Sequence, residues 1–250
     1  MRPLLLLLAA LFCQNLPAQK MLRSAEWCAE GHRAFPPSPV DTRSDSLDIL
    51  DTRIELDLMS APKISALCWL SVKAKVAGVK TLRLDLEKLV VEEVIYDNLL
   101  PVPFSQSGST LSISHPVLPQ GEAKTLRIKY SGTPVTDASG WGGVYNQSGY
   151  TFNLGVGFAA DPHSFGRAWF PCFDNFVERS TFDVTVTAPA AKPGYGNGYL
   201  VSETVQNGQS IRRWKIDQTI PAYLACFAAG PYTSWKRTGR PCCKSSMMLS

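Results

Sequence analysis

A chain of 250 residues has room for one large domain or two small ones. Hydrophobic residues make up 45% of it, an ordinary share for a globular protein, so a sizeable core is possible. The formal net charge of +4 is too small to predict a nucleic-acid partner, which normally needs a clustered basic face. The nearest cluster comprises Arg212, Arg213 and Lys215, and we interpret it as a solvated strand face.

The N-terminus has the pattern of a secretory signal peptide over residues 1–18. Arg2 supplies a short positive region, residues 4–12 are apolar but too few to span a bilayer, and Ala18 precedes a plausible cleavage point. We therefore expect an exported protein, periplasmic or secreted, without a transmembrane anchor.

Residues 19–45 lack periodicity and carry Pro36, Pro37 and Pro39, which predicts an irregular lead-in. From residue 46 onward apolar and polar residues alternate in short runs separated by Gly, Pro, Asn and Ser. The predicted strands are 52–58, 64–76, 82–86, 90–96, 111–113, 126–130, 182–188, 200–204, 211–216 and 223–228. No window has a helical stripe of normal length. The predicted fold over residues 46–235 is all-β, a multi-sheet sandwich or saddle-like domain of mostly antiparallel strands.

Residues 141–158 interleave glycines with aromatic rings, a combination that permits close approach of the backbone to another group. Two interpretations stay open: a surface where a substrate or partner domain docks, or a twisted inner strand with aromatic packing. Residues 236–250 lose all periodicity, which predicts either a disordered end or residues translated out of the native frame.

Cysteines and histidines offer little catalytic chemistry. Cys68, Cys172 and Cys226 have apolar neighbours and are predicted to be buried free thiols, although an exported compartment would permit disulfides. The histidines are His32, His115 and His163, and none has a second histidine within four residues, so no H-E-x-x-H zinc motif exists. We predict no catalytic residue, no metal site and no cofactor in this chain.

The segment 165–175 is the most informative stretch, because it combines four aromatic rings, a proline, a cysteine and one Arg/Asp pair. Such a mixture predicts a strand that enters a turn clamped against a core or a neighbouring domain. The signature residues are Arg167, Phe170, Pro171, Cys172, Phe173 and Asp174. They resemble a signature of the zinc aminopeptidases of the aminopeptidase N type (gluzincins), in which the segment lies in the N-terminal β domain. Further pieces that resemble this domain lie at 82–94, 118–132, 180–186, 197–202 and 220–232, so the resemblance spans residues 46–235.

The resemblance implies the N-terminal β domain of an exported zinc aminopeptidase, which removes N-terminal residues from peptides. In that family the zinc ligands and the Gly-x-Met-Glu-Asn segment belong to the catalytic domain. Neither motif occurs here, so we expect a chain that is inactive alone and whose partner is that catalytic domain, with peptide substrates only in the full enzyme. Arg167 and Asp174 would form a structural ion pair.

Two positions depart from the family pattern. Asn175 and Phe176 stand where the family usually has Glu-Pro. The family also has a Gln or Glu shortly before the signature Arg that anchors the substrate's amino group, and Asp161 is the acid nearest to that place. Two other functions remain possible: a secreted β-sandwich that binds carbohydrate or protein through Trp141, Tyr145 and Tyr150, and a regulator that docks on a full-length homologue.

Overall fold

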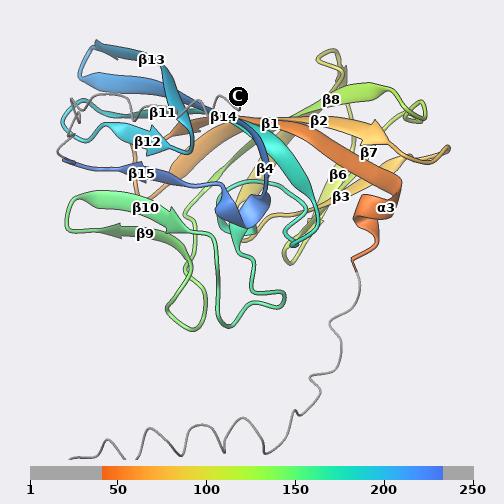
Figure 1. Ribbon diagram of the computed structural model, residues 1–250, viewed down its shortest axis with the longest axis horizontal. Helices are drawn as coiled ribbons and strands as arrows, with labels where there is room; N and C mark the ends of the chain where they lie inside the picture. The colour runs from red at the N-terminus through yellow and green to blue at the C-terminus, as the bar shows by residue number, and fades with distance from the viewer. Residues whose placement is uncertain (1–40, 233–250) are drawn as a thin grey trace, which may run out of the picture. The chain divides into compact units, whose positions relative to one another are not determined.

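The computed structural model describes residues 41–232 (Figure 1). The predicted signal peptide, most of the lead-in and the predicted tail lie outside the described residues. The strands are β1 (Leu47–Asp57), β2 (Ile64–Ala74), β3 (Thr81–Asp85), β4 (Val90–Tyr96), β5 (Leu100–Pro101), β6 (Phe104–Ser107), β7 (Thr110–Ser114), β8 (Ala123–Gly132), β9 (Gly143–Gln147), β10 (Tyr150–Leu154), β11 (Arg179–Pro189), β12 (Gly194–Gly196), β13 (Tyr199–Gln206), β14 (Gln209–Pro221) and β15 (Phe227–Ala229). The helices are α3 (Arg43–Ser46) and the 3-10 turns η3 (Gly166–Ala168) and η4 (Ala222–Leu224).

The described strands form three sheets, which confirms the all-β prediction. An eight-stranded sheet has the order β13-β14-β11-β1-β2-β8-β4-β5, a four-stranded sheet has the order β12-β15-β10-β9, and a three-stranded sheet has the order β3-β7-β6. Neighbouring strands pair antiparallel except β1 and β11, which are parallel. A parallel pair needs a long crossover, and here the crossover between β1 and β11 contains β2 to β10.

One hydrophobic core joins the three sheets. The alternation along β1 and β2 places Ile54, Leu70 and their neighbours on one face, where they are fully buried. The same cluster includes Leu84 of β3, Trp169 of the signature segment and Phe227 of β15. The signature segment is therefore part of the main core rather than a surface loop.

The structure also corrects several predictions. Residues 223–224 lie in η4 and not in a strand, because the chain leaves β14 at Pro221 and turns before β15. Cys226 is exposed rather than buried, since Phe227 takes the inward position next to it. Cys68 and Cys172 are buried free thiols as predicted. The last residues of the predicted irregular lead-in form the short helix α3.

The basic cluster on β14 is neutralised by acidic neighbours. Arg212 pairs with Glu203, Arg213 with Asp183 and Lys215 with Asp217. Among residues 41–232, none of the helices has the length and apolar character needed to cross a bilayer.

Substitution of a core leucine tests the register of β2. Leu70→Ala should lower the free energy of unfolding by about 2–5 kcal/mol, because it removes buried methyl groups and leaves a cavity. Leu99→Ala is the matched control: Leu99 is 87% exposed, and its loss should change stability by less than about 0.5 kcal/mol. Urea unfolding followed by tryptophan fluorescence measures both. Equal effects would mean that the inward face of β2 is assigned wrongly.

Candidate functional site around the signature segment

The signature segment is buried but is not a strand, which corrects the prediction. It forms the single 3-10 turn η3 and then one isolated bridge, in which Cys172 exchanges two backbone hydrogen bonds with Asp85 of β3. The reason is local: Trp169, Phe170 and Phe173 are all buried, so the side chains do not alternate, and Pro171 has no N–H to donate. The prediction that the segment is clamped against a core is confirmed.

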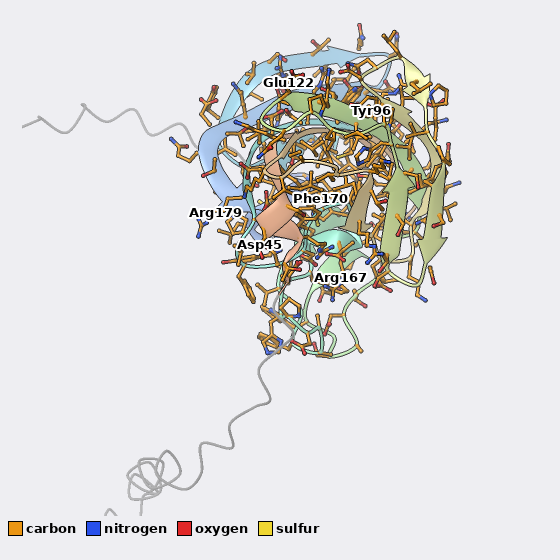
Figure 2. The ribbon with its side chains drawn as sticks, turned by 90° about the vertical axis from the view of Figure 1, so that its right-hand side faces the viewer. Asp45, Tyr96, Glu122, Arg167, Phe170 and Arg179 are labelled. Carbon is orange, nitrogen blue, oxygen red and sulfur yellow. The ribbon has the colours of Figure 1, made fainter. Side chains whose placement is uncertain are left out.

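Aromatic packing holds this segment in place. The ring of Trp169 contacts the rings of Phe170 and Phe227, with centroids 4.6 and 5.0 Å apart. The buried hydroxyl of Tyr130 on β8 donates to the carbonyl oxygen of Trp169 over 2.9 Å. Phe170 lies among the packed side chains in Figure 2, and Arg167 lies below it. Arg167 therefore lies at the boundary of the hydrophobic core.

Asp174 is the charged centre of the segment and is 2% exposed. Its carboxylate accepts hydrogen bonds from the backbone N–H groups of Gly166 and Arg167, at 3.0 and 3.3 Å, and pairs with Arg167 Nη1 at 3.2 Å. The predicted Arg167–Asp174 ion pair is confirmed. Burial raises the pKa of Asp174 to about 6, although Arg167 and the two N–H groups lower it.

A second ion-pair network ties the start of the described chain to the same place. The guanidinium of Arg43 bridges the carboxylates of Asp41 and Asp85, with 2.7 Å to each, and lies over the ring of Phe173. Asp85 in turn accepts the backbone N–H of Asp174 at 2.9 Å. Burial raises the pKa of Asp41, but the hydrogen bonds from Arg43 and Asn175 outweigh it and lower that pKa to about 2.

Asn175 stands where the family usually has Glu, and its side chain makes hydrogen bonds that hold the local turn. Its amide oxygen accepts the backbone N–H groups of Val177 and Glu178, and its amide nitrogen donates to Asp41 at 2.7 Å. An amide can serve as both acceptor and donor, which a Glu carboxylate cannot do. Asn175 therefore ends the signature segment in a turn that presents Phe176 and Val177 outward, both of them exposed.

Cys172 is buried and lacks the accessible surroundings of a reactive thiol. Burial raises the pKa of its thiol well above the ordinary value, with Asp174 and Asp85 acting in the same direction. His163 forms a hydrogen bond through Nδ1 with the carbonyl of Ala160, and His115 does so with that of Pro116.

Two loops beside the signature segment carry exposed rings. Trp141 and Phe158 stack with centroids 5.9 Å apart and are 52% and 61% exposed. The buried carboxylate of Asp137 joins the two loops by accepting the N–H groups of Ser139 and Ala159. Gly142 has a φ of 115°, and a Cβ there would overlap the carbonyl of Val156, so this close approach requires glycine.

Exposed apolar side chains occur on the two aromatic loops, on the turn after Asn175 and on η4, and together we call them the loop surface. Gly155 lets one aromatic loop approach η4 closely, because a Cβ there would overlap the carbonyl of Tyr223. The ring of Tyr223 packs edge-on against Phe176. The loop surface comprises Trp141, Phe158, Phe176, Val177 and Leu224.

The segment 141–158 shows the aromatic packing that one interpretation predicted, and its role as a docking surface stays a prediction. Tyr145 and Phe152 stack within the β9–β10 hairpin, and the Tyr145 hydroxyl donates to the carbonyl of Gly140. Trp141 and Phe158 at its two ends face outward. Asp161 lies exposed on the loop that follows, so its role as an anchor for a substrate amino group stays a prediction.

The described residues do not fit a zinc ion. Within residues 41–232 there is no group of three His, Cys, Asp or Glu side chains that could hold a metal. The acids near the signature segment are already engaged by Arg43 and Arg167. Sequence reasoning did not find Arg43, Asp41 and Asp85 as partners of this segment, because no spacing signal joins residues so far apart in the chain.

Comparison with known proteins decides the family. The profile of the Peptidase M1 N-terminal domain matches residues 59–224. This chain belongs to that family. The leucine aminopeptidase 2 of Candida glabrata is 33% identical over 169 residues, which are 63% of this chain and 24% of that protein.

Solved structures agree with this assignment. The M1 zinc metallopeptidase of Deinococcus radiodurans, in a form bound to a Tyr-Ser-Ala substrate, is 25% identical, with a TM-score of 0.66. That match covers 74% of this chain and 42% of the metallopeptidase. The yeast LTA4 hydrolase shares the fold, with a TM-score of 0.63 and 24% identity over 80% of this chain and 32% of the hydrolase. The M1 N-terminal domain described here thus spans less than half the length of these relatives.

Removal of the buried carboxylate tests the Arg167–Asp174 pair. Asp174→Ala should lower the free energy of unfolding by about 3 kcal/mol, because Arg167 and two backbone N–H groups lose their acceptor. The control is Asp217→Ala, which removes an exposed pair with Lys215 and should leave stability close to the parent's. Urea unfolding measures both variants. Equal decreases in the free energy of unfolding would show that the buried Asp174 pair stabilises the fold no more than an exposed pair does.

The raised pKa of Asp174 predicts a pH dependence. Its folded-state pKa of about 6 exceeds the ordinary 3.8, so its contribution to stability is complete below about pH 4 and is lost as the pH rises through 6. The difference in unfolding free energy, wild type minus Asp174→Asn, should therefore decrease across that window. Asp41 has the opposite sign: its contribution is present above about pH 4 and is lost as the pH falls toward 2. Urea unfolding at half-unit pH steps measures both trends, and a difference that is flat from pH 4 to 6 would contradict the first.

Proposed function

We propose that residues 41–232 act as the N-terminal β domain of an exported zinc aminopeptidase, packed against a catalytic domain that carries the zinc, and that they hydrolyse no peptide alone. The observation that carries the proposal is the loop surface, which lies beside the signature segment of an M1 N-terminal domain. A cluster of large exposed apolar side chains on a soluble domain marks an interaction site.

The form of the loop surface suits a docking site for a rigid neighbour. Asp137 binds the two aromatic loops together, and Asn175 holds the turn that presents Phe176 and Val177. Rings held in fixed positions lose little conformational entropy when a partner covers them. In the full enzyme this domain would form one wall of the active-site cleft and would restrict entry to peptides with a free N-terminus.

The binding-module alternative has less support. Trp141, Tyr145 and Tyr150 each pack against a different partner: Phe158, Phe152 and Tyr232 respectively. A sugar-binding platform needs free ring faces turned to the same ligand. The exposed rings are instead accompanied by aliphatic Val177 and Leu224, a composition typical of a protein–protein contact.

The test compares the chain alone with a chimera. The purified chain should neither retain zinc nor hydrolyse Tyr-Ser-Ala. A chimera in which residues 41–232 replace the corresponding domain of the Deinococcus radiodurans enzyme should hydrolyse Tyr-Ser-Ala and leave its N-acetylated form intact. Hydrolysis by the chain alone would overturn the proposal, as would a folded, zinc-loaded chimera without activity.

Dye binding tests the loop surface separately from the enzyme activity. The chain alone should bind a hydrophobic dye such as anilinonaphthalene sulfonate, and Phe158→Ser together with Phe176→Ser should remove most of the fluorescence gain. Tyr199→Ser is the matched control, because Tyr199 is an exposed ring on β13 outside the loop surface. An equal fall in both variants would show that the dye does not report this surface.

A further inference from the structure

The second exposed feature is the outer edge of the eight-stranded sheet. The edge strand β13 pairs only with β14 among the described strands, and Figure 1 places it at the margin of the sheet. All eight of its residues are exposed. Four of them are apolar: Tyr199, Leu200, Val201 and Val205.

Natural edge strands usually carry protection against pairing with another chain, such as proline, lysine or very short length. The opposite edge of the same sheet follows this rule, since β5 has only two residues and one is Pro101. β13 has neither proline nor lysine, and its single bulge, at Val201, lies near its start. The stretch from Ser202 to Gln206 is therefore a regular edge whose outward backbone groups pair with no other strand of residues 41–232.

The hairpin turn determines which backbone groups are free. Asn207 and Gly208 form a two-residue turn, with φ of 49° and 75°, and Gln206 pairs with Gln209 across it. In such a hairpin the flanking pair is hydrogen-bonded, and hydrogen-bonded pairs alternate along the strands. The backbone groups of Ser202, Thr204 and Gln206 thus face β14. Those of Glu203 and Val205 face outward.

We propose that this edge is a dimerisation site for a second copy of the chain, paired antiparallel about a two-fold axis at Thr204. In that register Thr204 lies opposite its counterpart, and Val205 lies opposite Glu203 of the second copy, with four interchain hydrogen bonds. Threonine pairs across strands are favourable, and no like charges face each other. A register centred on Glu203 would oppose two carboxylates, and one centred on Val205 would pair only three residues of each strand.

The interface is isologous, so it closes after two copies and does not propagate along the sheet. It is also independent of the proposed function, because β13 shares no residue with the loop surface.

Sedimentation equilibrium on the full chain tests the proposal, with a reversible monomer–dimer equilibrium as the expected result. Val205→Pro removes one outward N–H that β14 does not use, and should weaken dimerisation at least about tenfold. Val205→Lys should act in the same direction if the proline variant fails to fold. Val90→Lys is the matched control: Val90 is a valine of the same 61% exposure, on β4, and this variant should dimerise like the parent.

The register has a separate test in a Cys226→Ser background. Opposed residues of a non-hydrogen-bonded antiparallel pair have Cα atoms about 4.5 Å apart, within disulfide range. Thr204→Cys should therefore cross-link two copies under mild oxidation through the substituted positions, as mapped by mass spectrometry, and Val205→Cys should not. A chain that stays monomeric at its solubility limit overturns the proposal. So does a dimer that persists in both Val205 variants, or one that Phe158→Ser abolishes.

Discussion

A carboxylate buried in an aromatic core has to be surrounded by hydrogen-bond donors. Asp174 is such a carboxylate, and its need for donors constrains the backbone of the signature segment around it. Two backbone N–H groups of η3 and one guanidinium surround it. The 3-10 turn brings these N–H groups to one point, and Gly166 permits the close approach, because a Cβ there would press against the backbone of Ala222 in η4. The carboxylate therefore determines how the chain passes between the large sheet and the loops.

The network around Asp174 extends to residues far away in the sequence. Asp85 of β3 accepts the backbone N–H of Asp174, and Arg43 bridges Asp85 and Asp41. Asn175 completes the connection by donating to Asp41. The start of the described chain, the three-stranded sheet and the signature segment are thereby joined. Each member would be costly to bury alone, and each is tolerated because its partners are already in place.

Much of this architecture could be predicted from the sequence, and the failures have physical reasons. Period-two alternation located β1, β2 and β11, because one face of each strand is buried, and β-branched composition located β4. It failed for the signature segment, where consecutive rings are all buried and no face can be assigned. It also failed at residues 223–224, since the turn η4 has the same apolar and aromatic composition as a strand.

The contacts of the candidate site could also be predicted only in part. The Arg167–Asp174 pair could be predicted because its members are seven residues apart in one segment, and the structure has them in contact. The partners Asp41, Arg43 and Asp85 come from other elements, so only the fold brings them together. Cys226 has apolar neighbours like Cys172, yet it is exposed. It lies just before β15, where the side chain of Phe227 points into the core instead.

The same network links the buried signature to the exposed loop surface. Phe176 and Val177 follow directly after Asn175, whose amide oxygen holds the N–H of Val177 while its nitrogen is held by Asp41. The ring of Phe176 then packs against that of Tyr223 in η4, whose carbonyl lies close to Gly155. The hydrogen bonds of Asn175, next to Asp174, thus hold the backbone that carries Phe176 and Val177. In the proposed enzyme, a charged group in the core would help to present the loop surface to the catalytic domain, because hydrogen bonds fix direction as aromatic packing alone does not.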